Sequence, residues 1–206
     1  MNGVSKQRLL LATRNAHKTR EVREILGSGW EVEDLTARPD LPEVEETGET
    51  FEENARLKAV AGSAHYDGWV LADDSGLEVD ALEGAPGVRS ARFAGDNADM
   101  AANRALLIEK LREVRGKERS GRFHCVLALA KGGEVVRVFH GTIEGVITPA
   151  ERGSGGFGYD SLFVPEGACR TFAEMSGAQK HALSHRGRAL AALAAYLTTG
   201  AGPAAA

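Results

Sequence analysis

The order in which strand-like and helix-like segments follow one another is the feature of this sequence that most restricts its fold. Residues 8–13 form an apolar run typical of a buried strand, and residues 18–26 carry apolar side chains on one side of a predicted helix. Residues 30–35 predict a second strand. A strand, a helix and a strand in this order indicate an α/β protein that begins with parallel strands.

Two later strands point to a mixed sheet. Residues 123–131 and 134–148 have strand-like patterns and are separated by Gly132 and Gly133 alone. A two-glycine connection between apolar runs is typical of an antiparallel β-hairpin. A parallel opening followed by a hairpin therefore predicts an α/β fold with a mixed β-sheet flanked by helices.

Three further helices are expected along the chain. Residues 51–64 form the first, with Thr50 as N-cap and Glu53 completing a capping box. Amphipathic patterns predict the others over residues 96–115 and 179–197. No internal repeat or low-complexity linker divides the chain, so we expect a single α/β domain over residues 1–199 and a flexible tail over residues 200–206, which are rich in glycine and alanine.

Composition excludes several classes of function. A net charge of −4 gives no electrostatic footprint for wrapping a nucleic-acid backbone. No apolar run approaches the roughly 18 residues that would cross a bilayer. The N-terminal residues show no secretory signal. We therefore expect a cytoplasmic protein that binds neither nucleic acid nor membrane and that takes any nucleotide singly, in a pocket.

The loop over residues 13–18 leads from the first predicted strand into the start of a helix. Backbone amides and the dipole at a helix N-terminus favour an anion such as phosphate. Lys18 would add a positive charge, and Thr13 and Asn15 would add neutral polar groups. The loop is neither a Walker A motif nor a dinucleotide-binding fingerprint. The alternative is a solvated helix start without a ligand.

Two adjacent carboxylates, Asp73 and Asp74, follow the short apolar strand predicted over residues 69–72, with another strand over residues 77–82. Carboxylates beside buried apolar residues need a counterion, because an unpaired buried charge is costly. Magnesium fits this need, since it binds through one or two carboxylates plus phosphates and water. Glu46, in an acidic loop before a helix, is a candidate to complete the site. The alternative is an acidic turn at a strand end.

Residues 155–160 place two aromatic side chains among glycines, next to one carboxylate. Phe157 or Tyr159 offers a flat apolar surface on which a nucleobase stacks, and Asp160 can accept a hydrogen bond from a ring N–H. The alternative is a glycine-aromatic turn that packs on the core.

The last predicted helix carries a charged residue on its apolar face. Arg186 lies near the middle of that face, and an inward arginine needs a partner. Helical spacing puts Lys180 and His185 to either side of it, so the three residues are expected to rim a pocket. The alternative is an arginine paired with a structural carboxylate.

Taken together, these segments closely resemble the inosine triphosphate pyrophosphatase family, whose members hydrolyse non-standard purine nucleoside triphosphates. The matching segments occur in the family's order and cover nearly the whole chain: residues 11–18, 46–55, 71–77, 84–92, 155–160 and 184–186. Arg14 is a departure, because the family often has glycine there.

The resemblance implies an elongated α/β fold, a homodimer, and one or more Mg²⁺ ions in each active site. It places Asp74 and Lys18 in catalysis, and Glu46 and Asp74 on the metal, with Asp73 as a further candidate ligand. It places the substrate against residues of the first loop, of the aromatic loop and of the last helix: Thr13, Arg14, Asn15, Ala16, His17, Lys18, Ser75, Phe157, Gly158, Tyr159, Asp160, Lys180, His185 and Arg186.

The implied reaction converts inosine, deoxyinosine or xanthosine triphosphate (ITP, dITP or XTP) into the monophosphate and pyrophosphate, which removes these nucleotides before they enter DNA or RNA. We expect a metal-activated water to attack the α-phosphorus, with Asp74 orienting or deprotonating it. Two alternatives remain: a pyrophosphatase for other unusual nucleotides, such as modified pyrimidines, or a catalytically silent nucleotide-binding protein. The acidic pair argues against the silent protein, because carboxylates repel a triphosphate unless a metal intervenes.

Overall fold

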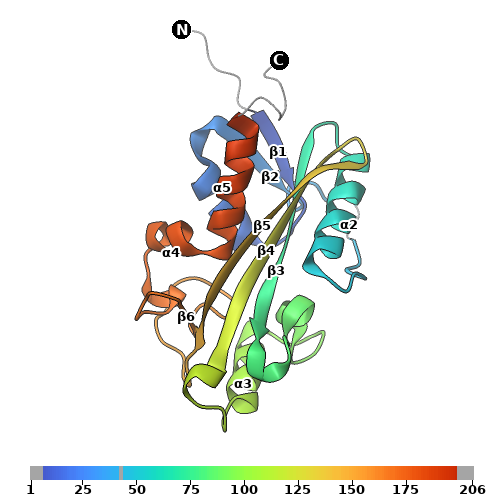
Figure 1. The fold of residues 1–206 in the computed structure, drawn as a ribbon. Coiled ribbons are helices and arrows are strands. Elements are labelled where there is room, and N and C mark those ends of the chain that lie inside the picture. The colour runs from blue at the N-terminus through green and yellow to red at the C-terminus, as the bar shows by residue number, and fades with distance from the viewer. Residues whose placement is uncertain (1–6, 42–43, 199–206) are drawn as a thin grey trace. The chain divides into compact units, whose positions relative to one another are not determined.

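The computed structural model describes residues 7–41 and 44–198 of the chain. Figure 1 traces its elements in chain order. The strands are β1 (Gln7–Leu11), β2 (Trp30–Asp34), β3 (Trp69–Val79), β4 (Ser120–Lys131), β5 (Glu134–Ile147) and β6 (Phe163–Pro165). The α-helices are α1 (Ala16–Leu26), α2 (Phe51–Ala64), α3 (Met100–Lys110), α4 (Gly177–Leu183) and α5 (His185–Thr198).

The six strands form one mixed sheet in the order β2-β1-β3-β4-β5-β6. β1 pairs in parallel with both β2 and β3, whereas β5 and β6 are antiparallel. β4 and β5 are neighbours joined through Gly132 and Gly133 alone, both with positive φ, as a tight hairpin requires. The predicted mixed α/β fold is therefore confirmed.

The chain forms two compact units that are interleaved in sequence. Among the described residues, the first unit comprises residues 7–41, 44–74, 126–140 and 189–198, and the second comprises residues 75–125 and 141–188. The chain passes between them within β3, β4, β5 and α5. The single domain over residues 1–199 stays a prediction, and the tail over residues 200–206 lies outside the described residues.

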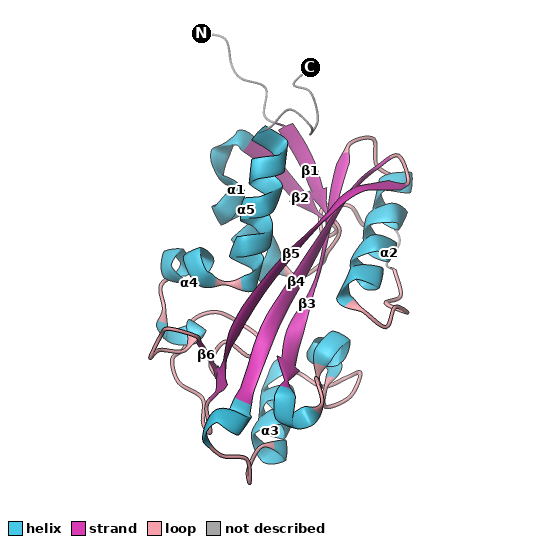
Figure 2. Cartoon of the chain, in the orientation of Figure 1, coloured by secondary structure: helices cyan, strands magenta, loops and turns pink. Residues whose placement is uncertain are grey.

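Each unit has its own buried core. In the first unit, β1 contributes Leu9, Leu10 and Leu11 next to Val70 and Leu71 of β3, all at most 1% exposed. In the second unit the core combines aliphatic side chains with aromatic ones, and the rings of Phe123, Phe163 and Phe172 contact one another. The aromatic segment at residues 155–160 lies in the loop that leads from β5 to β6 in this second unit (Figure 2).

Helix α2 begins as its sequence predicts. The Thr50 hydroxyl accepts a hydrogen bond from the Glu53 amide, and the Glu53 carboxylate accepts one from the Thr50 amide. The expected helix over residues 96–115 is shorter in the structure, where α3 starts after its N-cap Asp99. No helix within the described residues is long and apolar enough to span a bilayer.

Two predictions about element boundaries were wrong. The two strands expected over residues 69–72 and 77–82 are one continuous strand, β3, so the acidic pair lies inside a strand and not at its end. The single helix expected over residues 179–197 is two helices, because Ser184 adopts an extended conformation between α4 and α5. The Ser184 hydroxyl accepts a hydrogen bond from the Gly187 amide, which caps the start of α5.

Candidate active site

The loop between β1 and α1 is closed by its own polar side chains. Asn15 is the N-cap of α1, and its side-chain oxygen accepts hydrogen bonds from the amides of His17 and Lys18. Thr13 accepts one from the amide of Asn15. The predicted phosphate-binding residues from Arg14 to His17 are exposed, with Ala16 as the first residue of α1. Two of the backbone amides on which the predicted anion site depends, those of His17 and Lys18, therefore already donate hydrogen bonds to the Asn15 side chain.

Arg14 does not strain this loop. Glu83 is the one non-glycine residue with positive φ among the described residues, so Arg14 has an ordinary backbone conformation. Its guanidinium donates a hydrogen bond to the carbonyl of Leu35, 3.0 Å away. The loop thus accommodates an arginine at a position where the inosine triphosphate pyrophosphatase family often has glycine.

Lys18 extends from α1 to the acidic pair on β3. Its ammonium lies 2.5 Å from Asp73 Oδ1 and 3.2 Å from the Asp73 carbonyl oxygen. Asp73 is 1% exposed, so this carboxylate is buried with a direct positive partner. A lysine in this position holds its positive charge at the edge of the acidic cluster.

Asp74 pairs with a lysine from a different helix. Lys58 of α2 donates to Asp74 Oδ1 at 2.7 Å, to Glu46 Oε1 at 2.8 Å and to the Asp73 carbonyl at 3.0 Å. Successive side chains on a strand point to opposite faces, which explains why Asp73 and Asp74 have different lysine partners. Glu46, Asp73, Asp74, Lys18 and Lys58 thus form one cluster in the first unit, which we call the acidic cluster.

Burial and charge shift the acid-base properties of this cluster in opposite directions. Burial raises the pKa of Asp74, and Glu46 raises it further, while Lys58 and Lys18 act against the rise. Burial alone would lower the pKa of Lys58, but the carboxylates of Asp74 and Glu46 raise it overall. Lys58 is therefore held as a cation, and Asp74 is a stronger proton acceptor than an exposed aspartate.

The acidic cluster offers hard oxygen ligands to a cation. Two carboxylates converge on a single ammonium at Lys58, which shows that this point already accommodates a positive charge. Oxygens of this kind are the ligands that Mg²⁺ prefers. No group of three or more histidine, cysteine or acidic side chains in the described ranges is arranged as a complete metal cage. A site that holds magnesium through few carboxylates, with phosphates and water completing it, fits both observations.

The second unit contains a cationic and aromatic cluster. Lys180 of α4 and Arg186 of α5 both lie over the ring of Phe157, with Lys180 Nζ at 4.7 Å and Arg186 Cζ at 5.6 Å from its centroid. Arg186 is 1% exposed and donates to the Ser75 hydroxyl at 2.8 Å. Sequence spacing correctly predicted that this arginine is buried, although Lys180 lies on a separate helix.

Asp160 holds the aromatic loop against this cluster. Its Oδ2 accepts hydrogen bonds from Lys180 Nζ at 2.5 Å and from the Phe157 amide at 2.8 Å. Gly156 has a φ of 68°, and a Cβ there would overlap the Asp160 carboxylate, so glycine is required at this turn. We call Ser75, Phe157, Asp160, Lys180 and Arg186 the base cluster.

Two predicted base-binding residues lie in the hydrophobic core of the second unit. Tyr159 is 2% exposed, and its hydroxyl donates to the Ser90 carbonyl. His185 stacks on Phe123, with ring centroids 4.7 Å apart and planes inclined by 11°. Gly158 accepts a hydrogen bond from Arg104 of α3 through its carbonyl. Of the two candidate stacking rings, Phe157 is the one that remains partly exposed.

Sequence reasoning missed Lys58. This residue follows Asn54 by four positions and Ala55 by three, and both are fully buried on α2. It therefore lies on the buried face of the helix by the same spacing argument that identified Arg186. Lys58 could therefore have been identified from the sequence as a lysine on the buried face of a helix that follows the acidic loop.

Comparison with known proteins shows the family to which the chain belongs. A model of the Ham1 family matches residues 9–196. A dITP/XTP pyrophosphatase of Exiguobacterium sibiricum is 52% identical over 194 residues, covering 93% of this chain and 98% of that protein. A protein of the same name from Geobacter sulfurreducens is 50% identical over 192 residues, covering 92% and 96%. The chain belongs to the Ham1 family, which confirms the resemblance drawn from its motifs.

Solved structures show the same fold. A HAM1 protein from Coxiella burnetii superposes with a TM-score of 0.84 at 40% identity, covering 94% of this chain and 99% of that one. A Mycobacterium abscessus protein, titled nucleoside-triphosphatase / dITP/XTP pyrophosphatase, superposes with a TM-score of 0.73 at 47% identity, covering 91% and 98%.

Proposed function

We propose that this protein hydrolyses non-standard purine nucleoside triphosphates, namely ITP, dITP and XTP, to the nucleoside monophosphate and pyrophosphate. The observation that carries the proposal is the acidic cluster, in which two lysines form ion pairs with three carboxylates, two of them buried. Relatives of about half-identical sequence bear the name dITP/XTP pyrophosphatase, which supports the same substrate class.

Glu46 and Asp74 would hold a magnesium ion, with Asp73 as a further candidate ligand. Their oxygens already converge on the ammonium of Lys58, so the donor set suits a hard cation. Bound there, magnesium would supply positive charge to the phosphate oxygens and Lewis acidity to water. Lys58 would keep the two carboxylates together and partly neutralised when the ion is away.

Within the acidic cluster, Asp74 would accept the proton of the attacking water, because burial raises its pKa toward the working pH. Lys18 would neutralise charge on the phosphates, with Thr13 and Asn15 beside it. The base cluster would take the purine. Phe157 would stack on the ring, while Arg186 and Lys180 supply donors that suit a carbonyl at position 6.

We further propose that the protein works in the cytoplasm as a homodimer. The family resemblance supports the dimer. Sedimentation of the purified chain over a range of concentrations checks the dimer, and a concentration-independent monomer would contradict it.

Product analysis tests the proposed function. The purified protein should release pyrophosphate, and not inorganic phosphate, from ITP, dITP and XTP when Mg²⁺ is present, and should act far more slowly on ATP. Chelation with EDTA should stop the reaction, and excess Mg²⁺ should restore it. Tight nucleotide binding without turnover would support a catalytically silent nucleotide-binding protein. Faster turnover of modified pyrimidine triphosphates would support a pyrophosphatase for other unusual nucleotides.

Lys18→Ala is expected to lower kcat/KM for every accepted triphosphate by a similar factor, about 10- to 100-fold, because a phosphate contact carries no information about the base. The ratio of ITP to ATP turnover should therefore persist. Lys110→Ala, at an exposed lysine of α3, is the control and should leave both rates unchanged. A large change in the ratio would place Lys18 near the base.

A further inference from the structure

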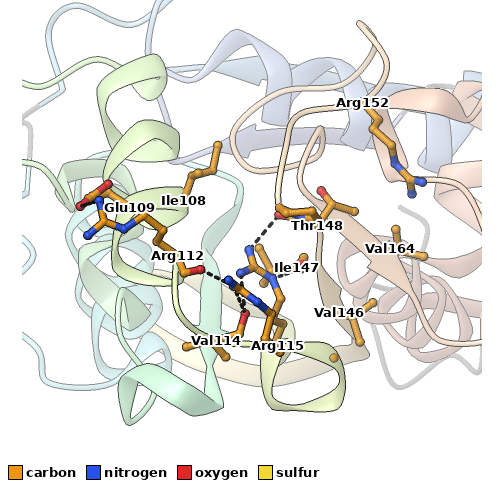
Figure 3. A pocket seen from close by; sticks show the side chains of 13 residues that line it. Ile108, Glu109, Arg112, Val114, Arg115, Val146, Ile147, Thr148, Arg152 and Val164 are labelled. Carbon is orange, nitrogen blue, oxygen red and sulfur yellow. Dashed lines mark hydrogen bonds and ion pairs between the residues drawn. The ribbon is translucent and has the colours of Figure 1, made fainter.

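A pocket in the second unit shares no residue with the base cluster. It has a cavity volume of about 840 Å³, which lies within the range of about 300–1,000 Å³ typical of small-molecule sites. In Figure 3, Ile108, Arg112 and Val114 line one side, and Val146 and Val164 line the other. The pocket thus combines apolar walls with charged side chains.

The charges that line this pocket are predominantly positive. Four arginines contribute to it, Arg112, Arg115, Arg119 and Arg152, against a single carboxylate, Glu109. Arg112 forms ion pairs with Glu109 and Glu113, and Arg152 pairs with Glu174. Within residues 7–41 and 44–198, Arg115 and Arg119 have no carboxylate partner, so two positive charges at this pocket are uncompensated.

Arg119 is the more informative of the two, because it is 7% exposed. Its guanidinium donates to the carbonyls of Ile147, Leu111, Val114 and Thr148. These bonds occupy both hydrogens of Nη1, the hydrogen of Nε and one of the two on Nη2, so one N–H remains. Carbonyls satisfy the hydrogen-bonding capacity of an arginine, but they do not cancel its formal charge.

Burial and the like charge of a neighbour both disfavour the cationic form of Arg119. Burial lowers the pKa of Arg119, and the neighbouring Arg115 lowers it further. An anion placed at the pocket would relieve both costs, since it would neutralise the buried guanidinium and screen it from its neighbour. Arginine is also the residue best suited to bind carboxylate or phosphate groups.

We propose that this pocket binds a small organic anion, with an apolar body lying against Ile108, Val146 and Val164 and a carboxylate, sulfonate or phosphate group directed to Arg115 and Arg119. The lining explains both halves of this ligand. An apolar wall alone would accept a neutral molecule, and an arginine cluster alone would accept inorganic phosphate. A site with both features selects a molecule that carries both.

Fluorescence titration with 8-anilinonaphthalene-1-sulfonate tests the proposal, because this probe has an apolar body and one anionic group. We expect saturable binding of one probe per folded chain. The uncharged analogue N-phenyl-1-naphthylamine, which lacks the sulfonate, should bind at least about tenfold more weakly, because it loses a charge-assisted contact. Equal binding of the two probes would overturn the assignment of an anion site.

Two variants and a matched control locate the binding. Arg115→Glu reverses one uncompensated charge, and Val146→Glu places a carboxylate on the apolar wall, so each should weaken probe binding at least about tenfold. Val136→Glu is the control, because Val136 lies on the same strand, is 44% exposed against 41% for Val146, and does not line the pocket. It should bind the probe as the wild type does.

The other outcomes are equally decisive. Probe binding that survives both pocket variants would overturn the proposal. A second result would also overturn it: a wild-type dimer that does not bind the probe, together with a Val146→Glu variant that is monomeric. The pocket would then be covered by a second copy of the chain. Because the readout is probe binding, and not triphosphate hydrolysis, failure of this proposal is distinguishable from failure of the proposed function.

Discussion

Asp74→Asn is expected to lower kcat for dITP about a thousandfold or more while leaving the protein folded. The change removes a candidate magnesium ligand and the proposed proton acceptor but keeps the shape of the side chain. Folding should survive because Lys58 retains Glu46 and the Asp73 carbonyl as partners. Steady-state rates at saturating Mg²⁺, together with circular dichroism of the variant, check both parts.

Two companion variants make this result specific. Asp73→Asn removes the carboxylate that pairs with Lys18 and should be less damaging than Asp74→Asn. If it proves more damaging, the roles within the pair are reversed. Asp67→Asn, at an exposed aspartate, should have no effect. Near-normal turnover by Asp74→Asn would remove this residue from both proposed roles.

Arg186→Ala is expected to lower kcat/KM for ITP by about 100-fold while lowering the slow turnover of ATP much less. A guanidinium can only donate hydrogen bonds, so it suits the position-6 carbonyl of hypoxanthine and xanthine but faces the amine of adenine unfavourably. An unpaired buried donor costs about 1–3 kcal/mol, which corresponds to roughly tenfold to hundredfold discrimination. Measuring kcat/KM for both nucleotides gives the ratio directly.

Because Arg186 is 1% exposed, its truncation carries a risk to folding. Arg186→Lys retains the charge and most of the volume, so it provides a second test if the alanine variant is unstable. Ser75→Ala removes the hydroxyl to which Arg186 donates and should produce a smaller change in the same direction. Equal losses for ITP and ATP in these variants would make Arg186 a phosphate-binding or structural residue, and donor matching would not explain base selection.

Local sequence signals predicted the elements that begin or end at capping residues or at turn glycines. The capping box of Thr50 and Glu53 gave the start of α2, and the adjacent glycines at residues 132–133 gave the hairpin of β4 and β5. The buried position of Arg186 followed from helical spacing. These features depend on residues close together in the sequence, so a pattern can reveal them.

The features that were missed depend on long-range contacts. The polar stretch from Asp73 to Gly76 interrupts the apolar pattern, yet β3 continues through it, beyond the residues that pair with β1. Its other neighbour there is β4, a strand from much later in the chain. Lys58 meets Asp74 across 16 positions of sequence. The core positions of Tyr159 and His185 were missed because their partners, Ser90 and Phe123, lie more than 60 residues away.

Hydrolysis of dITP in ¹⁸O-labelled water tests the central claim most directly, because the label marks the phosphorus that water attacks. The account predicts that, with Mg²⁺ present, one labelled oxygen enters deoxyinosine monophosphate and none enters the released pyrophosphate. It also predicts that the Asp74→Asn variant forms almost no labelled product. Label in pyrophosphate or inorganic phosphate, or full labelling of the monophosphate without a divalent metal, would contradict the account.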